Sequence, residues 1–239
     1  MLPLHDNVPT RGFPVVTVGL ITANAAVWFW EFSGTSVEVD LFRYGFYPCK
    51  VAGPCYLPGL PGLHAAELPW WQSVFTSMFM HASLAHILGN ILFLWIFGNN
   101  VEDALGRARF LLWYLAAGVV AASLQTFVTL WFGTAADASI PNIGASGAIS
   151  GVLGAYVVLL PRAKVLTLVG WFPLQLPALL YIGFWFALQL WAGSSSVVNP
   201  QSGGGVAFFA HVGGFLFGVV TVRLVASGRP YAPSTDARP

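Results

Sequence analysis

The chain has 239 residues, of which 56% are hydrophobic and only 8% are charged, and its formal net charge is +1. A soluble domain carries about 25% charged residues, so this chain has too few charges to cover a water-facing surface of its size. We therefore expect the lipid bilayer to surround most of it, and the absence of a long basic run argues against nucleic acid as a partner.

Six apolar stretches predict an all-α bundle of six transmembrane helices. They are residues 13–32, 84–97, 110–132, 146–160, 165–191 and 206–225. A helix needs about 20 apolar residues to cross a typical bilayer. The second and fourth stretches reach this length only if the polar residues around His81 and Ser146 also enter the membrane. The first stretch has no basic segment before it and no small-residue cleavage site after it, so we expect it to be retained as a span.

The placement of Lys and Arg predicts the orientation of the bundle, because cytoplasmic loops carry an excess of both. One side of the predicted bundle has only two basic residues, Arg43 and Lys50. The opposite side has eight: Arg11, Arg107, Arg109, Arg162, Lys164, Arg223, Arg229 and Arg238. We therefore expect an N-terminal cytoplasmic segment (1–12), a membrane domain (13–226) and a disordered cytoplasmic tail (227–239). The first, third and fifth loops (34–80, 133–145 and 192–205) should face the outside.

The long first outer loop is rich in Gly, Pro and aromatic residues. Its last part could lie in the membrane interface, where aromatic and apolar side chains gather; the alternative is a partly structured surface loop. The residues concerned are Trp70, Trp71, Phe75, Phe79 and Met80. The two cysteines of the chain, Cys49 and Cys55, also lie in this loop. They could form a disulfide in an oxidising compartment, and the alternative is two free thiols.

Polar residues within spans are expensive and usually functional. His86 and Asn90 in the second span are four residues apart and so share one helix face. Ser146 begins the fourth span, and His211 lies about five residues into the sixth, roughly 7 Å below its start. All three spans begin on the same side, so these four side chains should lie at a similar depth.

These residue types fit a serine hydrolase. A serine hydroxyl is a weak nucleophile until a base takes its proton, and His211 is a suitable base for Ser146. The unpaired N–H groups at the helix start, with His86 and Asn90, could form an oxyanion hole. A serine between glycines is more often a packing residue, and a lone intramembrane histidine can be structural. The four residues together favour the hydrolase.

Two glycine pairs predict close contact between the fourth and sixth spans. Gly147 and Gly151 form one small-xxx-small pattern, and Gly214 and Gly218 form another. Such patterns let helix backbones approach each other closely. We expect this contact to bring Ser146 to His211.

The chain resembles the rhomboid family of intramembrane serine proteases, in its bacterial six-span form. The resemblance extends from residue 13 to residue 225. It rests on Gly144-Ala145-Ser146-Gly147, on His86-Ile-Leu-Gly-Asn90, on Ala210-His211-Val-Gly-Gly214-Phe-Leu-Phe-Gly218 and on Gly98-Asn99-Asn100-Val101-Glu102-Asp103.

The resemblance implies an endopeptidase that hydrolyses peptide bonds in or near transmembrane segments of membrane proteins. Ser146 would be the nucleophile and His211 the base, in a dyad without a third acid. His86, Asn90 and the N–H of Ser146 would be the oxyanion donors, and no metal or other cofactor would take part. The partners would be transmembrane substrates and the bilayer, in a bacterial plasma membrane with the site towards the outer side. Nothing in the sequence points to a particular oligomeric state.

Further positions match the family pattern or depart from it. Gly144 matches the loop glycine before the nucleophile, His81 a second loop histidine of structural role, and Glu102 a residue that ties down the cytoplasmic end of the second span. The family often has Trp-Arg before the second span, where this chain has Trp71-Gln72. Some members carry a Tyr that stacks on the histidine, where this chain has Ser150. That departure leaves the orientation of His211 open.

A substrate helix must reach Ser146 from the lipid, and the bulky fifth span is the candidate gate. We expect Phe184, Trp185 and Trp191 to close against the second span, and the loop 193–205, rich in Gly and Ser, to cap the site. This resembles the lateral gate proposed for the rhomboid family. The alternative is an ordinary lipid-facing helix followed by a connecting loop.

Three other classes of protein compete with this interpretation. A catalytically inactive rhomboid-like binding protein would lack the serine or the histidine, and this chain has both. Other intramembrane proteases need a His-Glu-xx-His zinc motif or a Gly-Asp pair, which the sequence lacks, and His81 and His86 are poorly spaced for zinc. A transporter would explain Pro173 and Pro177 as a helix break, but charged residues along a transport path are missing.

Overall fold

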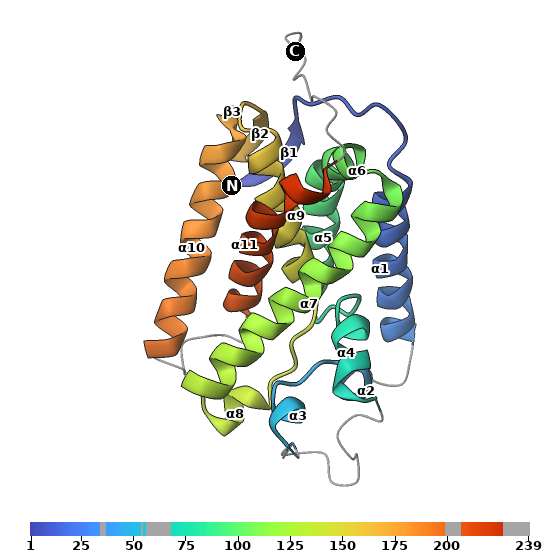
Figure 1. Ribbon diagram of the computed structural model, residues 1–239, viewed down its shortest axis with the longest axis vertical. Helices are drawn as coiled ribbons and strands as arrows, with labels where there is room; N and C mark the ends of the chain where they lie inside the picture. The colour runs from blue at the N-terminus through green and yellow to red at the C-terminus, as the bar shows by residue number, and fades with distance from the viewer. Residues whose placement is uncertain (34–36, 54, 56–67, 199–206, 227–239) are drawn as a thin grey trace.

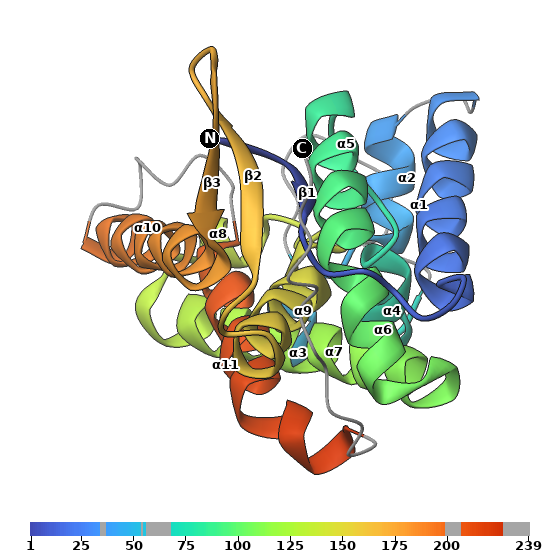
Figure 2. The same ribbon diagram turned by 90° about the horizontal axis from the view of Figure 1, so that it is seen from above.

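The computed structural model describes residues 1–33, 37–53, 55, 68–198 and 207–226, and the predicted disordered tail lies outside these residues. Long helices run between two ends of the molecule, and a small sheet lies at the end that also holds the N-terminus (Figures 1 and 2).

Six apolar helices make up the bundle, as predicted. Five of the described helices are long and apolar enough to cross a membrane, namely α1 (Val15–Ser33), the continuous helix Leu84–Leu105, α7 (Arg107–Phe132), α10 (Ala178–Val198) and α11 (Phe208–Val225). The sixth, α9 (Ser146–Leu159), is shorter. The helix Leu84–Leu105 consists of α5 (Leu84–Phe93), one π-helical turn η1 (Leu94–Gly98) and α6 (Asn99–Leu105).

The short helix α9 is the core of the bundle. Every residue from Gly147 to Tyr156 is buried, and the helix packs against α11, α7 and η1. Its 14 residues span about 21 Å, less than the roughly 30 Å of a hydrocarbon core. Irregular backbone is tolerated at membrane depth where protein surrounds it. The loop before α9 can therefore run into the bundle and place Ser146 among the other helices.

Glycines set the separation of α9 and α11. A Cβ atom on Gly214 would collide with the carbonyl oxygen of Gly147, and one on Gly218 would collide with that of Gly151. The two backbones are therefore in direct contact, as small-xxx-small patterns allow.

The predicted fifth span, residues 165–191, is wrong in its first half. Residues from Lys164 form a hairpin of β2 (Lys164–Val169) and β3 (Phe172–Pro177), and α10 begins only at Ala178. Gly170 supplies the turn with a φ of +61°. The prolines of β3 disfavour a helix there, and two β-branched residues of β2, Val165 and Thr167, point inward and are fully buried.

The N-terminal segment belongs to the folded molecule. Strand β1 (Leu2–Asp6) pairs with β2 in an antiparallel sheet of order β1-β2-β3. The Asp6 carboxylate accepts hydrogen bonds from the Tyr156 hydroxyl of α9 (2.5 Å) and from Asn100 Nδ2 of α6 (2.6 Å). Burial raises the pKa of Asp6 above its ordinary value. This strand thus ties the sheet to the central helix.

Short helices cover the other end of the molecule, namely α2 (Val37–Tyr44), α3 (Cys49–Ala52), α4 (Trp70–Ser77) and α8 (Ala135–Ala138). Cys49 and Cys55 form a disulfide with 5.3 Å between their Cα atoms. Trp70, Trp71 and Phe75 are exposed, as a membrane-interface position requires, whereas Met80 is buried inside the protein. The interface prediction for Met80 is therefore wrong.

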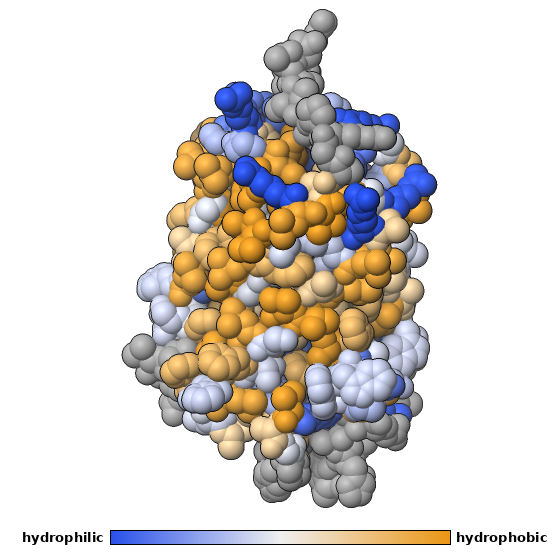
Figure 3. Space-filling model, in the orientation of Figure 1, coloured by the Kyte–Doolittle hydropathy of each residue, from blue (hydrophilic) through white to orange (hydrophobic). Residues whose placement is uncertain are grey.

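The surface is banded. On the face shown in Figure 3, a broad apolar belt crosses the middle, and hydrophilic residues gather at the end that carries the sheet. The described basic residues at that end are Arg11, Arg107, Arg109, Arg162, Lys164 and Arg223, and those at the opposite end are Arg43 and Lys50.

Candidate active site

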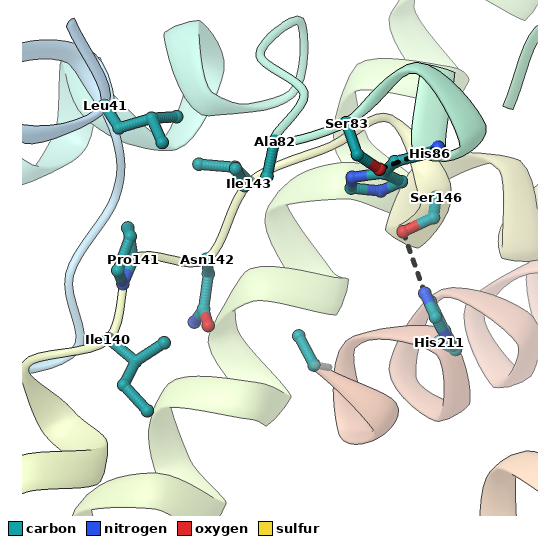
Figure 4. Close-up of a pocket in the computed structure, with 11 residues that line it drawn as sticks. Leu41, Ala82, Ser83, His86, Ile140, Pro141, Asn142, Ile143, Ser146 and His211 are labelled. Carbon is teal, nitrogen blue, oxygen red and sulfur yellow. Dashed lines mark hydrogen bonds between the residues drawn. The ribbon is translucent and has the colours of Figure 1, made fainter. Parts of the chain in front are cut away.

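Ser146 and His211 meet between the two central helices. Ser146 is the first residue of α9, and His211 lies in the first turn of α11. The distance from His211 Nε2 to Ser146 Oγ is 2.8 Å, which is a hydrogen bond (Figure 4). A nucleophile and a base at this distance satisfy the geometric requirement for proton transfer.

The start of α11 is held by a neighbouring helix. The Gln125 side chain of α7 accepts hydrogen bonds at Oε1 from the N–H groups of Phe209 (3.0 Å) and Ala210 (3.2 Å). The first N–H groups of a helix lack the usual partner four residues earlier, although the Ala210 N–H also donates to the Ala207 carbonyl oxygen (3.1 Å). Together with the glycine contact to α9, this cap fixes the position of the backbone that carries His211.

Two polar side chains of α5 face the backbone before Ser146. Gly144 has a φ of +108°, and a Cβ atom there would lie 2.6 Å from His86 Nε2 and 3.7 Å from Asn90 Nδ2. Only glycine suits this conformation and this space. Asn90 Nδ2 is buried and has no hydrogen-bond partner among the described residues. A buried free donor therefore points towards the site beside Ser146.

A cavity of about 510 Å³ opens onto the dyad. Ser146, His211 and His86 lie at one side of it (Figure 4). The rest of the lining is largely apolar and comes from α2, the loop before α9 and the ends of α5 and α11: Leu41, Ala82, Ser83, Ile140, Pro141, Asn142, Ile143 and Ala207. The cavity is large enough for several side chains of a peptide segment.

His81 lies behind His86 rather than in the cavity lining. It is fully buried, its ring lies 5.0 Å from the His86 ring, and its backbone N–H donates to Glu31 Oε2 of α1 at 3.4 Å. Glu31, which is also fully buried, was not among the residues predicted from the sequence. The signal was available, because a carboxylate inside an apolar stretch is expensive and marks a specific role.

Glu102 lies at the sheet end of the molecule. It is near the end of the continuous helix Leu84–Leu105, and His86 is near the beginning of the same helix. The Glu102 carboxylate accepts hydrogen bonds from the backbone N–H groups of Val16 (3.0 Å) and Thr17 (2.7 Å) and from the Thr17 hydroxyl (2.8 Å). It caps the N-terminus of α1, so it joins the first two spans at this end.

The side chains of the three predicted gate residues on α10 point in different directions. Phe184 and Trp191 are exposed, whereas the Trp185 ring packs 5.8 Å from the ring of His211. The predicted loop 193–205 begins too early, because residues up to Val198 continue α10. The hydroxyls of Ser194 and Ser195 bond back to the Trp191 carbonyl within this helix. Residues 199–206 of the predicted loop lie outside the described part of the chain.

His211 has a direct partner that was not predicted from the sequence. Gln189 Oε1 of α10 lies 2.7 Å from His211 Nδ1. Gln189 is the one side-chain amide in an otherwise apolar stretch of α10, and that isolation was the available signal. Ser150 does not take this place, because its hydroxyl donates to the Ser146 carbonyl oxygen.

Comparisons with known proteins identify the family of the chain. A rhomboid domain profile matches residues 68–228, a range that includes both Ser146 and His211. Over 165 residues the chain is 35% identical to the rhomboid protease GluP of Bacillus subtilis, which covers 68% of this chain and 28% of the relative.

Other relatives cover a similar part of the chain. The mitochondrial rhomboid protein 1 of Saccharomyces cerevisiae is 34% identical over 62% of this chain and 40% of its own length. The putative rhomboid protease YdcA of Bacillus subtilis is 32% identical over 62% of this chain and 63% of its own length. The matches thus span less than two thirds of these relatives. Because the domain profile covers more than half of the chain and the apolar helices surround a partly buried serine–histidine pair, this multi-pass membrane protein belongs to the rhomboid family.

Proposed function

We propose that this protein is an intramembrane serine endopeptidase that hydrolyses peptide bonds in or near the transmembrane segments of membrane proteins. The observation that carries the proposal is the 2.8 Å hydrogen bond between His211 Nε2 and Ser146 Oγ, made across two spans and open to a cavity. Relatives named as rhomboid proteases support the same activity.

The reaction has two halves. His211 Nε2 takes the proton of Ser146 as Oγ attacks the scissile carbonyl carbon, and the resulting imidazolium then gives that proton to the departing amine. The acyl group stays on Ser146. A water molecule then attacks the acyl carbon as His211 takes its proton. The bond between the acyl carbon and Ser146 Oγ breaks, His211 returns the proton to Oγ, and the acid product leaves the free serine.

The negative charge on the tetrahedral intermediate needs donors that are already in place. The N–H of Ser146 at the start of α9 is one, and the positive end of the helix dipole favours an anion there. Asn90 Nδ2 and the His86 ring face the same space from α5. Asn90 is suited to the role because its buried donor has no other partner among the described residues.

The geometry also suggests an orientation. Ser146 and His211 lie near the starts of helices that begin at the end opposite the sheet, whereas most described basic residues lie at the sheet end. Under the positive-inside rule the sheet, segment 1–12 and tail 227–239 face the cytoplasm, and the site faces the outer side of a bacterial plasma membrane.

A substrate helix would enter sideways, between α10 and α5. Helix α10 lies at the edge of the bundle in both ribbon views (Figures 1 and 2). Its exposed residues Phe184 and Trp191 face away from the core, and Trp185 packs on His211. Movement of α10 would therefore open a path from lipid to the dyad.

The main alternative is a rhomboid-like protein that binds membrane proteins without cutting them. Substitution of Ser146→Ala or His211→Ala separates the two functions. In proteoliposomes, each variant should abolish cleavage of a single-span substrate, and the double variant should be no worse, because the dyad acts as a unit. A fluorophosphonate should label the parent protein at Ser146.

The matched control is Ser123→Ala, which removes an exposed serine of α7 and should leave cleavage unchanged. Near-native turnover by the Ser146→Ala variant would exclude Ser146 as the nucleophile. A parent protein that neither cleaves the substrate nor takes the fluorophosphonate at Ser146 would leave the binding protein as the better interpretation.

A further inference from the structure

We propose that Gln189 of α10 is a positioning residue for His211. Its amide oxygen holds the imidazole proton on Nδ1, which leaves the Nε2 lone pair free to accept the proton of Ser146. The inference rests on the proposed function, since it assigns the residue that prepares the base for that reaction.

The two hydrogen bonds of the His211 ring define its tautomer. Gln189 Oε1 lies 2.7 Å from Nδ1, and Ser146 Oγ lies 2.8 Å from Nε2. An amide oxygen can only accept, so Nδ1 must donate, and a neutral imidazole carries one N–H. Nε2 is then the acceptor for the serine hydroxyl. In the other tautomer Nε2 would carry the proton and could not act as a base towards Ser146.

No other described side chain accepts a hydrogen bond from His211 Nδ1. Each helix around His211 offers a different group: α9 offers Ser146 on the Nε2 side, α5 offers His86, and α10 also offers the Trp185 ring. From α7, Gln125 accepts hydrogen bonds from the backbone N–H groups of Phe209 and Ala210 and donates one to the Thr129 hydroxyl. His86 lines the same cavity as His211 and is the other titratable residue in its described lining.

The position of Gln189 supports a specific role. A side-chain amide in a membrane span is costly to leave without a partner, and Gln189 is partly buried with its oxygen on His211. Trp185 lies four residues earlier and so shares the same helix face. Helix α10 thus supplies both an aromatic ring and a hydrogen-bond acceptor to the base. When α10 moves away to admit a substrate, His211 loses both, so the dyad is fully aligned only with α10 in place.

Two substitutions of Gln189 test the assignment. Gln189→Leu keeps the approximate size but removes the acceptor, and kcat should fall about tenfold with little change in KM, the effect of losing one hydrogen bond to the base. The rate of fluorophosphonate labelling of Ser146 should fall by the same factor, because the small probe does not need the gate. Leu188→Ala, an exposed neighbour on the same helix, is the matched control and should retain the parent rates.

Gln189→Glu is the conservative variant. Its carboxylate can only accept, so it should retain most of the turnover that Gln189→Leu loses. Its negative charge favours the imidazolium, so the acidic limb of the pH–rate profile should move to higher pH. Thermal unfolding of each variant in detergent separates these effects from loss of the fold.

The outcomes distinguish this inference from the proposed function. If Gln189→Leu matches Leu188→Ala in kcat and labelling rate while Ser146→Ala is inactive, the positioning role is wrong and the protease mechanism stands. If Gln189→Glu is as slow as Gln189→Leu, the amide oxygen does not hold the Nδ1 proton and the assignment is overturned. If Ser146→Ala itself cleaves, the proposed function fails first.

Discussion

Asn90 carries a buried donor that has no partner among the described residues, next to the backbone of Gly144. An oxyanion donor acts mainly in the transition state, so Asn90→Ala should lower kcat much more than it raises KM. The loss should reach at most about 100-fold, because His86 and the Ser146 N–H remain. Steady-state cleavage of a single-span substrate measures both constants.

Asn24→Ala is a useful control for this prediction, because Asn24 is another buried asparagine, on α1. It should cost stability without a specific loss of kcat. If Asn90→Ala instead leaves kcat unchanged while the melting temperature falls sharply, Asn90 is a structural residue.

Asp6 gives a prediction about pH and stability. Burial raises its pKa above the ordinary value of 3.8, so the folded state favours the protonated carboxyl. Its stabilising contribution is therefore present below pH 3.8 and is lost as the pH rises through the raised pKa. Asp6→Asn should flatten this part of the stability profile, and thermal unfolding in detergent between about pH 4 and pH 7 measures it. An identical pH slope in parent and variant would contradict the assignment.

At the scale of single residues, the sequence predicted which side chains form the site, but it did not predict all the residues that contact them. Ser146, His211, His86 and Asn90 stand out because each is polar within or at the end of an apolar stretch, and the structure brings them together. The contact between Gln189 and His211 joins residues 22 positions apart on different helices. Spacing within one helix contains no information about such a contact, although the isolated amide was visible.

The contact between α9 and α11 is the element that sets the dyad distance. A Cβ atom on Gly214 would collide with the Gly147 carbonyl oxygen, so Gly214→Val must push the two helices apart. A displacement of about 1 Å can cost roughly 100-fold in rate, and we expect a loss of at least that size together with a lower melting temperature. Cleavage assays and thermal unfolding measure the two effects.

Gly183→Val provides the matched control, because a Cβ atom there has no neighbour within 4 Å and faces away from the core. This variant should keep parent activity. Full activity in Gly214→Val would mean that the glycine contact does not set the geometry of the dyad.

Hydropathy predicted the helices of the bundle but not the sheet. The hairpin β2–β3 is as apolar as a span, so composition alone merged it with α10 into one stretch. Gly170 and the two prolines were the local signals against a continuous helix. Strand β1 could not be predicted from residues 2–6 alone, since its pairing with β2 joins segments about 160 residues apart.

In the whole molecule, the short buried helix α9 lies inside a ring of longer helices. A substrate must therefore pass between these helices to reach Ser146. Helices α7 and α11 and the continuous helix Leu84–Leu105 surround α9. Helix α10 also contacts α9, but it lies at the edge of the bundle with many exposed residues. The hydrogen bond that His211 Nδ1 donates to Gln189 Oε1 and the packing of Trp185 on His211 attach α10 to the site. Towards α5, the rings of Tyr181 and Phe93 lie 6.4 Å apart. This contact is a suitable place to lock the proposed gate.

The last prediction is that joining α10 to α5 blocks membrane substrates but not small reagents. Cysteines at Phe93 and Tyr181, in a chain with Cys49→Ser and Cys55→Ser, would be the only thiols, because the protein has two cysteines in total. A short reducible crosslinker should then stop cleavage of a single-span substrate in proteoliposomes, because α10 can no longer move aside. Fluorophosphonate labelling of Ser146 should continue at the rate of the uncrosslinked variant, since the cavity itself is unchanged.

Reduction should restore cleavage, and each single-cysteine variant treated in the same way should remain active. Undiminished cleavage by fully crosslinked protein would place the substrate entrance elsewhere on the bundle.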